Sequence, residues 1–426
     1  MLAGLAAGPL LSQIFQPAAF GQYSMLLAVV GIMAVVVTLR LDQLMPSSAD
    51  AASSFWLMSL TSVLGATAVG LALGLTWLPW SQALFVGLAV VATALFNGFY
   101  YLRLIEDRAL RATAGRSVQA VGVLGGQASF GLVGLGMNGL LWGELFGRAA
   151  ALLTVFRFVE RRSGAQLKIC WEEQWGKARW LLPSALLGAL SLQLLPLGMV
   201  PAVGAASAGV FMLVYRMVVI PNSLLSKVVS DSLLVELGRL RQQGEPCGTL
   251  MEQGCGRLLI AATGIYGVLA IHGGWLFPLI LDGAWTQAGE LVLWLSVLVA
   301  GWSVASPMAA VFVALGKTQW SLGLSTLDLM NRAVALAVGL FSADIVLASQ
   351  VLAAGGVMVY GASVLISLML SGARAKTVLV KIGPLLAVLL VLLLLSQYLL
   401  TIGAFWWAVI CGALVSGLAL RKVIYG

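Results

Sequence analysis

Long apolar runs dominate the chain, and short breaks containing polar residues, glycine or proline separate them. A helix needs about 20 mostly apolar residues to cross a bilayer. The candidate runs lie near residues 1–15, 20–41, 53–78, 82–105, 116–136, 138–158, 178–200, 205–226, 254–281, 286–315, 318–341, 344–371, 376–400 and 402–424. The pattern therefore predicts an all-α polytopic membrane protein with about 14 transmembrane helices.

The first run is shorter than the others. At about 1.5 Å per residue, residues 1–15 do not reach across the hydrocarbon core of a bilayer. We expect the natural chain to begin upstream of Met1; the alternative is a first helix that enters the membrane only partway. The apolar run Leu2–Phe15 has no basic segment before it, so no cleavable signal peptide is predicted.

Basic residues follow a strict pattern between the runs. Successive loops of such a chain alternate between two sides of the membrane. Of the 24 Lys and Arg residues, all except Arg148, Arg216 and Arg332 fall on one side and none on the other. Loops rich in Lys and Arg remain in the cytoplasm. We therefore expect cytoplasmic termini, and we attribute the net charge of +8 to loops that anchor helices and face anionic lipid rather than nucleic acid.

Composition excludes several classes of protein. Hydrophobic residues make up 61% of the chain and charged residues 9%, whereas about 25% of a soluble domain is charged. A soluble enzyme, a disulfide-built secreted domain and a disordered scaffold are excluded. The four cysteines lack metal-ligand spacing and His272 is the single histidine, so no metal or other cofactor is expected. We expect His272 to be structural.

The spans divide into two sets of six with a pair left over. Span two opens with Phe20–Tyr23 and span eight with Ala208–Phe211, and in both a glycine stands two residues before an aromatic residue. This similarity predicts a parallel repeat about an axis along the membrane normal. The predicted domains are an N-terminal lobe at 1–158, a cytoplasmic amphipathic connector at 159–177, a C-terminal lobe at 178–371 and an appended helix pair at 372–426.

Several short motifs occur together in the order and spacing of a known family. They are Pro9-Leu10-Leu11-Ser12 with Pro17 and Phe20-Gly21-Gln22-Tyr23, Leu39-Arg40-Leu41-Asp42, Tyr215-Arg216 with Pro221 and Leu224-Leu225, and Phe277-Pro278 with Gly283-Ala284-Trp285 and Ala288-Gly289. Up to about residue 371, the chain resembles the polysaccharide transporter branch (O-antigen, or Wzx-type, flippases) of the multidrug/oligosaccharidyl-lipid/polysaccharide exporter superfamily.

The resemblance implies two six-helix lobes around a central cavity. It also implies alternating-access transfer of undecaprenyl-diphosphate-linked oligosaccharide across the bacterial inner membrane, for O-antigen, capsule or exopolysaccharide synthesis. The expected partners are this lipid-linked cargo, membrane lipids, H⁺ or Na⁺ as a counter-ion, and a polysaccharide polymerase or other assembly machinery.

Ionisable residues inside the spans are the candidate site. An arginine at bilayer depth costs about 2.5–3.5 kcal/mol on insertion scales, so it should face protein, a partner or water. Glu144 and Arg148, and likewise Asp328 and Arg332, stand four residues apart, which places each acid beside its arginine on a helix. Each pair either neutralises itself and joins helices, or its arginine binds a cargo phosphate while its acid takes up H⁺ or Na⁺.

Arg216 has no acid three or four residues away, which makes it the strongest candidate for the substrate cavity, ahead of Arg332 and Arg148. The alternative for Arg216 is an acid on another helix. Arg40 and Asp42, at the inner end of span two, are candidates for a cytoplasmic gate, against interfacial anchoring.

Two other functions compete with the flippase. One is a cation-coupled multidrug exporter of the same superfamily, which would need unpaired acids facing the cavity. The other is a membrane glycosyltransferase or polymerase, which normally needs a sizeable outer loop bearing acids, arginines or histidines. The longest predicted outer loop, near 281–286, offers only Asp282. The sequence therefore favours a transporter over an enzyme.

Overall fold

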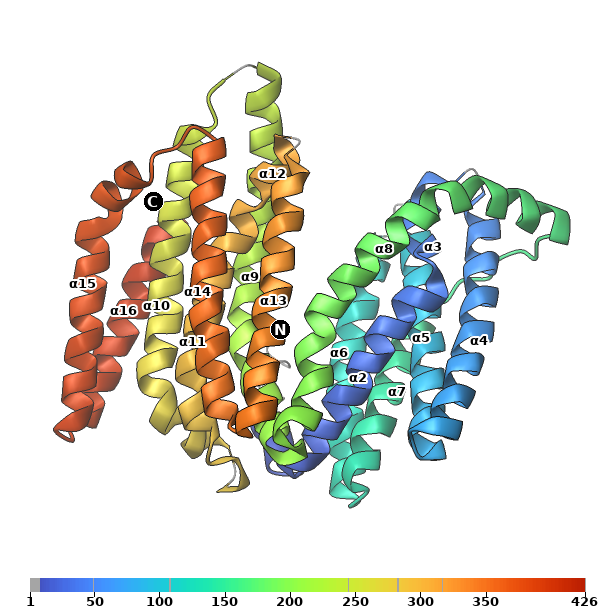
Figure 1. Ribbon diagram of the computed structural model, residues 1–426, viewed down its shortest axis with the longest axis horizontal. Coiled ribbons are helices and arrows are strands. Elements are labelled where there is room, and N and C mark those ends of the chain that lie inside the picture. Colours follow the sequence, from blue (N-terminus) through green and yellow to red (C-terminus); the bar gives the residue numbers. More distant parts are fainter. Residues whose placement is uncertain are drawn as a thin grey trace. The chain divides into compact units, whose positions relative to one another are not determined.

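The computed structural model describes residues 8–425 except 49, 107, 108, 244, 282 and 316. Within that part of the chain nearly every residue is helical and no strand occurs (Figure 1). The helices are α2 (Pro17–Thr38), α3 (Leu41–Leu44), α4 (Ala51–Thr76), α5 (Trp80–Ile105), α6 (Ala109–Leu132), α7 (Gly136–Val155), α8 (Gly164–Val203), α9 (Ala205–Gln243), α10 (Gly248–Ile280), α11 (Ala288–Met308), α12 (Ala310–Ala314), α13 (Thr318–Ser342), α14 (Ile345–Leu370), α15 (Ala375–Thr401) and α16 (Phe405–Tyr425), with 3-10 turns η1 (Met45–Ser47) and η2 (Gly283–Trp285).

Ten helices of the described chain are long and apolar enough to cross a membrane. This confirms the prediction of an all-α polytopic membrane protein. The helices α6 and α7 coincide with predicted spans but are not among the ten, because glycine and polar side chains dilute their apolar character. In α16 the described apolar stretch Trp407–Ala419 is shorter than a full span. Of the first predicted span, residues 8–12 are helical and residues 1–7 lie outside the described chain.

The chain folds as two compact units, Met1–Gly209 and Val210–Gly426. In the first unit α2 packs along α8, α4 along α5, and α6 along α7. In the second unit α11 packs between α10 and α14, α13 lies along α14, and both α15 and α16 pack on α10.

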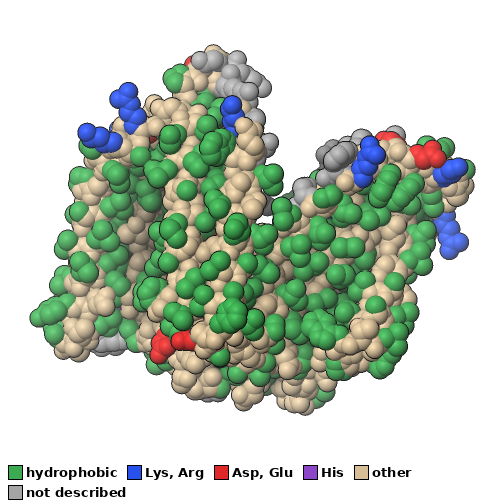
Figure 2. All heavy atoms as spheres, viewed as in Figure 1, with side chains coloured by type: hydrophobic (Ala, Val, Ile, Leu, Met, Phe, Trp, Pro, Cys, Tyr) green, Lys and Arg blue, Asp and Glu red, His purple; other side chains and the backbone are tan. Residues whose placement is uncertain are grey.

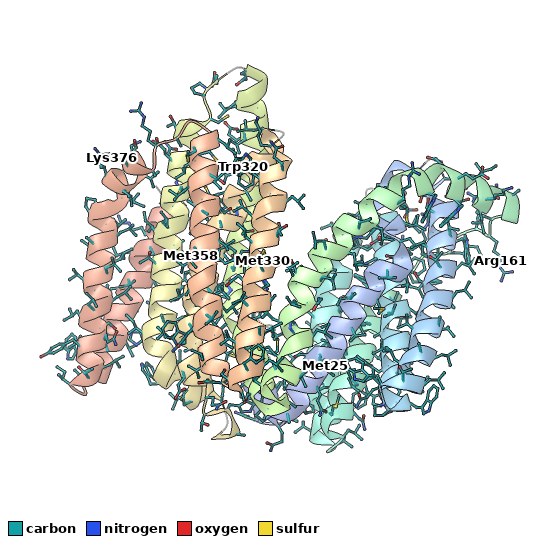
Figure 3. All side chains as sticks on the ribbon, viewed as in Figure 1. Met25, Arg161, Trp320, Met330, Met358 and Lys376 are labelled. Atoms are coloured by element: carbon teal, nitrogen blue, oxygen red, sulfur yellow. The ribbon has the colours of Figure 1, made fainter. Side chains whose placement is uncertain are left out.

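The sides of the helices carry the apolar residues that a bilayer requires. On the face shown in Figure 2, hydrophobic side chains cover the sides of both units, and the visible Lys and Arg side chains lie near helix ends. Met330 on α13 and Met358 on α14 project outward from their helices (Figure 3) and are more than half exposed. A water-soluble protein would bury such residues, whereas a lipid-facing surface favours them.

The predicted connector 159–177 is not a separate helix. Its residues from Gly164 onward form the first part of α8, which continues to Val203 without a break. Ser163 caps this helix with a capping box that it shares with Gln166. Cys170 and Gln174 are buried inside the first unit, against Ser54 of α4, whereas Trp175 stays exposed and stacks on Trp171. The lobe boundaries given above stay a prediction.

Gly21 of α2 and Gly209 of α9 form one very close helix crossing. A Cβ on Gly21 would overlap the carbonyl oxygen of Ala205, and a Cβ on Gly209 would overlap that of Pro17. The contact is symmetric, because Pro17 and Ala205 each stand four residues before the glycine of their own helix. The two glycines that suggested a repeat therefore meet in one reciprocal contact, and the repeat itself stays a prediction.

Methyl groups at this crossing are expected to be strongly destabilising. Gly21→Ala and Gly209→Ala should each lower the free energy of unfolding by about 1–3 kcal/mol, because backbone atoms cannot move aside for the new methyl group. Gly188 of α8 has open space around its Cβ position. Gly188→Ala should therefore be neutral or should stabilise the protein by about 0.5–1 kcal/mol. Unfolding in mixed micelles measures all three, and equal responses would contradict the close crossing.

Candidate functional site

Glu144 and Arg148 form a buried ion pair on α7, as their spacing predicts. Arg148 Nε and Nη2 each lie 2.9 Å from Glu144 Oε1. The side chain of Glu144 is 9% exposed and that of Arg148 is 11% exposed. Both residues lie near the middle of α7, far from either polar end of the helix. The pair thus avoids placing a lone charge inside the membrane.

Three other helices complete the hydrogen bonds of this pair. Tyr23 of α2 donates its hydroxyl to Glu144 Oε2 at 2.6 Å. Gln127 of α6 donates to the Tyr23 hydroxyl at 2.9 Å. Arg148 Nη1 donates to the carbonyl oxygen of Ala89 on α5 at 3.1 Å and also to the Thr93 hydroxyl. We call this set of side chains the first-unit network.

Glycines of α7 bring α6 close enough to build the network. Gly139, Gly143 and Gly147 recur at four-residue spacing, so they share the face that meets α6. A Cβ on Gly143 would overlap Gln127, and one on Gly147 would overlap Val123. The missing side chains therefore allow Gln127 to reach the Tyr23 hydroxyl.

Asp328 and Arg332 form the corresponding pair on α13 of the second unit. Arg332 Nε donates to Asp328 Oδ2 at 2.8 Å. Tyr360 of α14 donates its hydroxyl to Asp328 Oδ1 at 2.9 Å. Tyr215 of α9 lies close enough to interact electrostatically with Arg332. The i,i+4 prediction is thus confirmed for this pair too, and we call these side chains the second-unit cluster.

The two pairs differ in how far their hydrogen-bonding groups are used. Arg148 donates to a carboxylate, a carbonyl and a hydroxyl. Arg332 makes one hydrogen bond within the described chain, through Nε. A guanidinium has five N–H donors, so Arg332 keeps terminal donors for another acceptor. Asp328 is more open than Glu144, with 19% of its side chain exposed against 9%, whereas Arg332 is less exposed than Arg148, at 5% against 11%.

Tyr360 also borders a pocket of the second unit. This cavity of about 530 Å³ lies among α10, α11 and α14 and is lined almost entirely by apolar side chains, with Ser296 and Tyr266 among the few polar ones. Because the hydroxyl of Tyr360 points to Asp328, the pocket and the second-unit cluster share one side chain.

Arg216 lies on an exposed face of α9 in the second unit. Among the described residues it has no hydrogen bond or ion pair. Eleven residues separate it from the start of α9, or roughly 16 Å, which is about half the thickness of the hydrocarbon core. An unpaired arginine at that depth is costly in lipid, so its face of α9 favours water or a polar ligand. Its role as a substrate-cavity residue stays a prediction.

Arg40 and Asp42 lie just beyond α2, around the short helix α3. Asp42 is buried, with 2% of its surface exposed, and Arg40 is partly buried. They do not form a close ion pair with each other in the described structure. Their assignment as a gate stays a prediction.

His272 ties the appended helices to α10. It accepts a hydrogen bond from Trp275 Nε1 at Nδ1, so its Nε2 carries the proton and donates to Ser396 Oγ at 2.7 Å. Ser396 of α15 in turn donates to the carbonyl oxygen of Ala408 on α16 at 3.0 Å. These contacts join helices, as expected of a structural histidine, and the structural role of His272 stays a prediction. No group of three or more His, Cys, Asp or Glu side chains in the described chain is arranged to hold a metal ion.

Ser396→Ala should loosen this connection. The variant leaves His272 Nε2 and the Ala408 carbonyl oxygen without their shared partner, which should cost about 1 kcal/mol of stability. Hydrogen exchange should rise in α15 and α16 and remain unchanged in the first unit. Ser367→Ala is the control, because its buried hydroxyl has no hydrogen-bond partner in the described structure.

Comparisons with known proteins identify the fold. Neither a protein-family model nor a curated protein matches the sequence. Among solved structures, the chain is similar to the lipid II flippase MurJ in an inward closed conformation, with a TM-score of 0.62 and 12% identity over 96% of this chain and 97% of that chain. It is also similar to an inward-facing multidrug resistance MATE transporter of the MOP superfamily, with a TM-score of 0.57 and 15% identity over 86% of this chain and 94% of that chain. The chain therefore has the fold that these two structures share.

Proposed function

We propose that the protein is a flippase of the polysaccharide transporter branch. It moves undecaprenyl-diphosphate-linked oligosaccharide units from the cytoplasmic to the outer leaflet of the bacterial inner membrane by alternating access. The membrane topology has both termini in the cytoplasm. The likeness to a lipid II flippase over nearly the whole of both chains carries this proposal.

Arginines at mid-membrane depth support a phosphorylated cargo. The lipid diphosphate is the most polar part of such a cargo and must cross the hydrocarbon core. Arg332 has terminal donors to spare, and Arg216 has no protein partner among the described residues. A guanidinium donates two parallel hydrogen bonds to a phosphate, which replaces part of its lost hydration. Arg216 and Arg332 therefore bind the diphosphate during transfer.

The two acid–arginine pairs have different roles, one in joining helices and one in binding cargo. Arg148 has its donors engaged in the first-unit network, so it holds helices together rather than binding cargo. Asp328 competes with the cargo phosphate for Arg332. When Asp328 takes up H⁺, or exchanges Arg332 for Na⁺, Arg332 becomes available to the cargo. Arg40 and Asp42 close the cytoplasmic end, and a polysaccharide polymerase consumes the flipped units.

A multidrug exporter is the second candidate, and the likeness to a MATE transporter favours it. Such a protein needs an acid that is free to attract a cationic drug. Glu144 and Asp328 both have arginine and tyrosine partners in the structure. This pairing favours the flippase.

Reconstitution separates the two functions. Purified protein in phospholipid vesicles receives a polyprenyl-diphosphate oligosaccharide with a fluorescent label on its sugar, and membrane-impermeant dithionite reports which leaflet carries the label. The flippase makes the protected fraction accessible faster than in protein-free vesicles. Parallel vesicles test uptake of a lipophilic cationic dye driven by a pH gradient. Dye transport without lipid transfer would replace the flippase by the exporter.

A further inference from the structure

Asp42 is a buried acid whose charge is poorly compensated. Only 2% of its surface is exposed, and Oδ1 has no hydrogen-bond partner in the described structure. Two residues away, Arg40 Nε is also buried without a partner. A carboxylate oxygen and a guanidinium N–H in one turn are complementary, yet each is left unsatisfied. Buried polar groups of folded proteins rarely remain so.

The backbone between α2 and α3 keeps these two groups apart. Leu39 and Arg40 have φ angles of 49° and 59°, so two consecutive residues with side chains adopt the left-handed conformation. L-residues rarely adopt it, because the Cβ crowds the backbone. Neither glycine nor asparagine relieves the strain here. Strained turns of this kind persist where the surrounding fold imposes them, often at switch regions.

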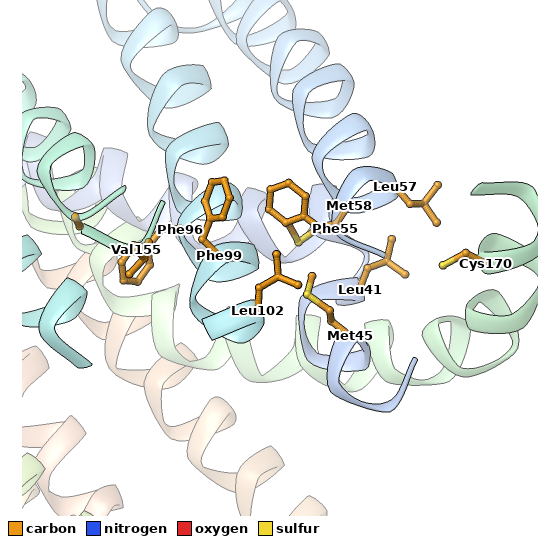
Figure 4. Close-up of a cluster of buried hydrophobic side chains, with 11 residues drawn as sticks. Leu41, Met45, Phe55, Leu57, Met58, Phe96, Phe99, Leu102, Val155 and Cys170 are labelled. Carbon is orange, nitrogen blue, oxygen red and sulfur yellow. The ribbon is translucent and has the colours of Figure 1, made fainter. Parts of the chain in front are cut away.

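Hydrophobic side chains surround this turn. Leu41 and Met45, on either side of Asp42, are fully buried in a cluster with Phe55, Phe99 and Leu102 (Figure 4). The helix α3 packs on α4, α5 and α8. Water therefore has little access to the carboxylate, and the charged form of an acid is costly in such surroundings.

Few charged or titratable groups of the neighbouring helices face Asp42. Arg40 interacts with it from the same turn, and Tyr101 faces it from α5. Arg116 of α6 interacts with Tyr101 and lies over the ring of Tyr100. Among the buried polar groups of α4 and α8, which pack on α3, are the Ser54 hydroxyl, the Cys170 thiol and the Gln174 amide, and these three bind one another. Asp50, at the start of α4, is engaged by Arg162.

We propose that Asp42 is a proton-binding site and that residues 39–42 form a protonation-controlled switch at the inner end of α2. The observed turn holds Asp42 protonated. Loss of the proton to water creates a carboxylate that attracts the Arg40 guanidinium, and the turn relaxes as the two groups pair. The switch requires neither a particular cargo nor a gate role for Arg40 and Asp42, so it can be absent while the flippase function holds.

The pKa of Asp42 is shifted in the direction that this role requires. Burial raises the pKa above the ordinary value. The charge of Arg40 and the backbone amides of Gln43 and Asp42 act to lower the pKa but do not cancel the effect of burial. Asp50 behaves in the opposite way. Burial acts to raise its pKa, but hydrogen bonds from Ser53 and the charge of Arg162 hold it below the usual range. Asp50 is thus a matched control in the same region.

Infrared difference spectroscopy of the full-length protein in lipid tests whether Asp42 carries a proton. The C=O stretch of a protonated carboxyl should persist in the wild type at a pH above the ordinary aspartate value of about 3.9. Asp42→Asn should lack this band, and Asp50→Asn should keep it. Arg40→Gln should move the disappearance of the band to a higher pH, because it removes a cation that favours ionisation. Identical wild-type and Asp42→Asn spectra above the ordinary range would overturn the proposal.

Hydrogen exchange tests the switch. With intrinsic rates corrected for pH, amide protection at residues 36–46 should fall several-fold in the wild type as Asp42 loses its proton. Asp42→Asn, which mimics the protonated side chain, should keep its protection over the same range. Asp50→Asn should follow the wild type. Equal pH profiles in wild type and Asp42→Asn would overturn the switch, even if Asp42 binds a proton.

Discussion

Arg148→Leu is expected to lower the free energy of unfolding by about 3–5 kcal/mol, because it leaves the Glu144 carboxylate buried without its cation. The leucine also removes the donor to the Thr93 hydroxyl, whereas the Ala89 carbonyl keeps the hydrogen bond from Thr93. Glu144→Leu should have a similar effect through the unpaired arginine. Unfolding of the purified protein in mixed micelles measures both variants.

The double variant Glu144→Leu/Arg148→Leu is the matched control. Replacing both members of a buried ion pair by apolar residues is often neutral or stabilising, so the double variant should be more stable than either single variant. Tyr23→Phe should cost only about 0.6 kcal/mol, the average for a hydrogen bond between membrane helices. The large loss of stability in the single variants thus comes from the buried charge that is left without its partner. Single variants within about 0.5 kcal/mol of the wild type would show that Glu144 is not charged in the fold.

Transport by the same double variant separates the two hypotheses for this pair. If Glu144 and Arg148 join helices, the double variant should fold and transport at close to the wild-type rate. Loss of transport in a stable double variant would assign the pair a part in moving cargo or ions.

The pairs could be predicted from sequence because their members lie on one helix. A spacing of four residues fixes the neighbours of a helical side chain whatever the tertiary fold. Tyr23, Gln127 and Tyr360 were not predicted, since each reaches its acid or its partner from another helix. The glycines at 139, 143 and 147 offered a signal, because their spacing marks a face of close approach to a neighbouring helix.

Hydropathy predicted helices well and their continuity poorly. The apolar runs correspond to helices from α2 onward because a bilayer requires internally hydrogen-bonded backbone. The polar residues before 178 suggested a separate connector, yet α8 continues through them. Polarity reports where a helix leaves the membrane, and the helix itself ends only where its backbone hydrogen bonds end. The strained turn at Leu39 and Arg40 was also beyond sequence reasoning, because neither residue type favours a left-handed conformation.

Arg332→Lys is expected to reduce transfer of the lipid-linked oligosaccharide by about 10- to 100-fold with little loss of fold. Lysine keeps the positive charge beside Asp328 but cannot donate two parallel hydrogen bonds to a phosphate. One charge-assisted hydrogen bond contributes about 1.5–3 kcal/mol, and 1.4 kcal/mol corresponds to about tenfold in affinity. Initial rates of leaflet exchange in vesicles, together with the free energy of unfolding, measure the two effects separately.

Asp328→Asn should strengthen cargo binding, whereas Arg332→Lys should weaken it. It removes the carboxylate that occupies Arg332 Nε, so the diphosphate no longer competes with it and cargo binding should tighten. Transfer should nevertheless slow, because an amide can neither take up H⁺ nor reclaim the arginine to release the cargo. Tyr360→Phe removes the other hydrogen bond to Asp328 but keeps the negative charge of Asp328. Its effects on cargo binding and transfer should therefore be smaller than those of Asp328→Asn and in the same direction. If Arg332→Lys and Arg148→Lys impaired transfer equally, or if Asp328→Asn weakened cargo binding, the second-unit cluster would have no special part in recognising phosphate.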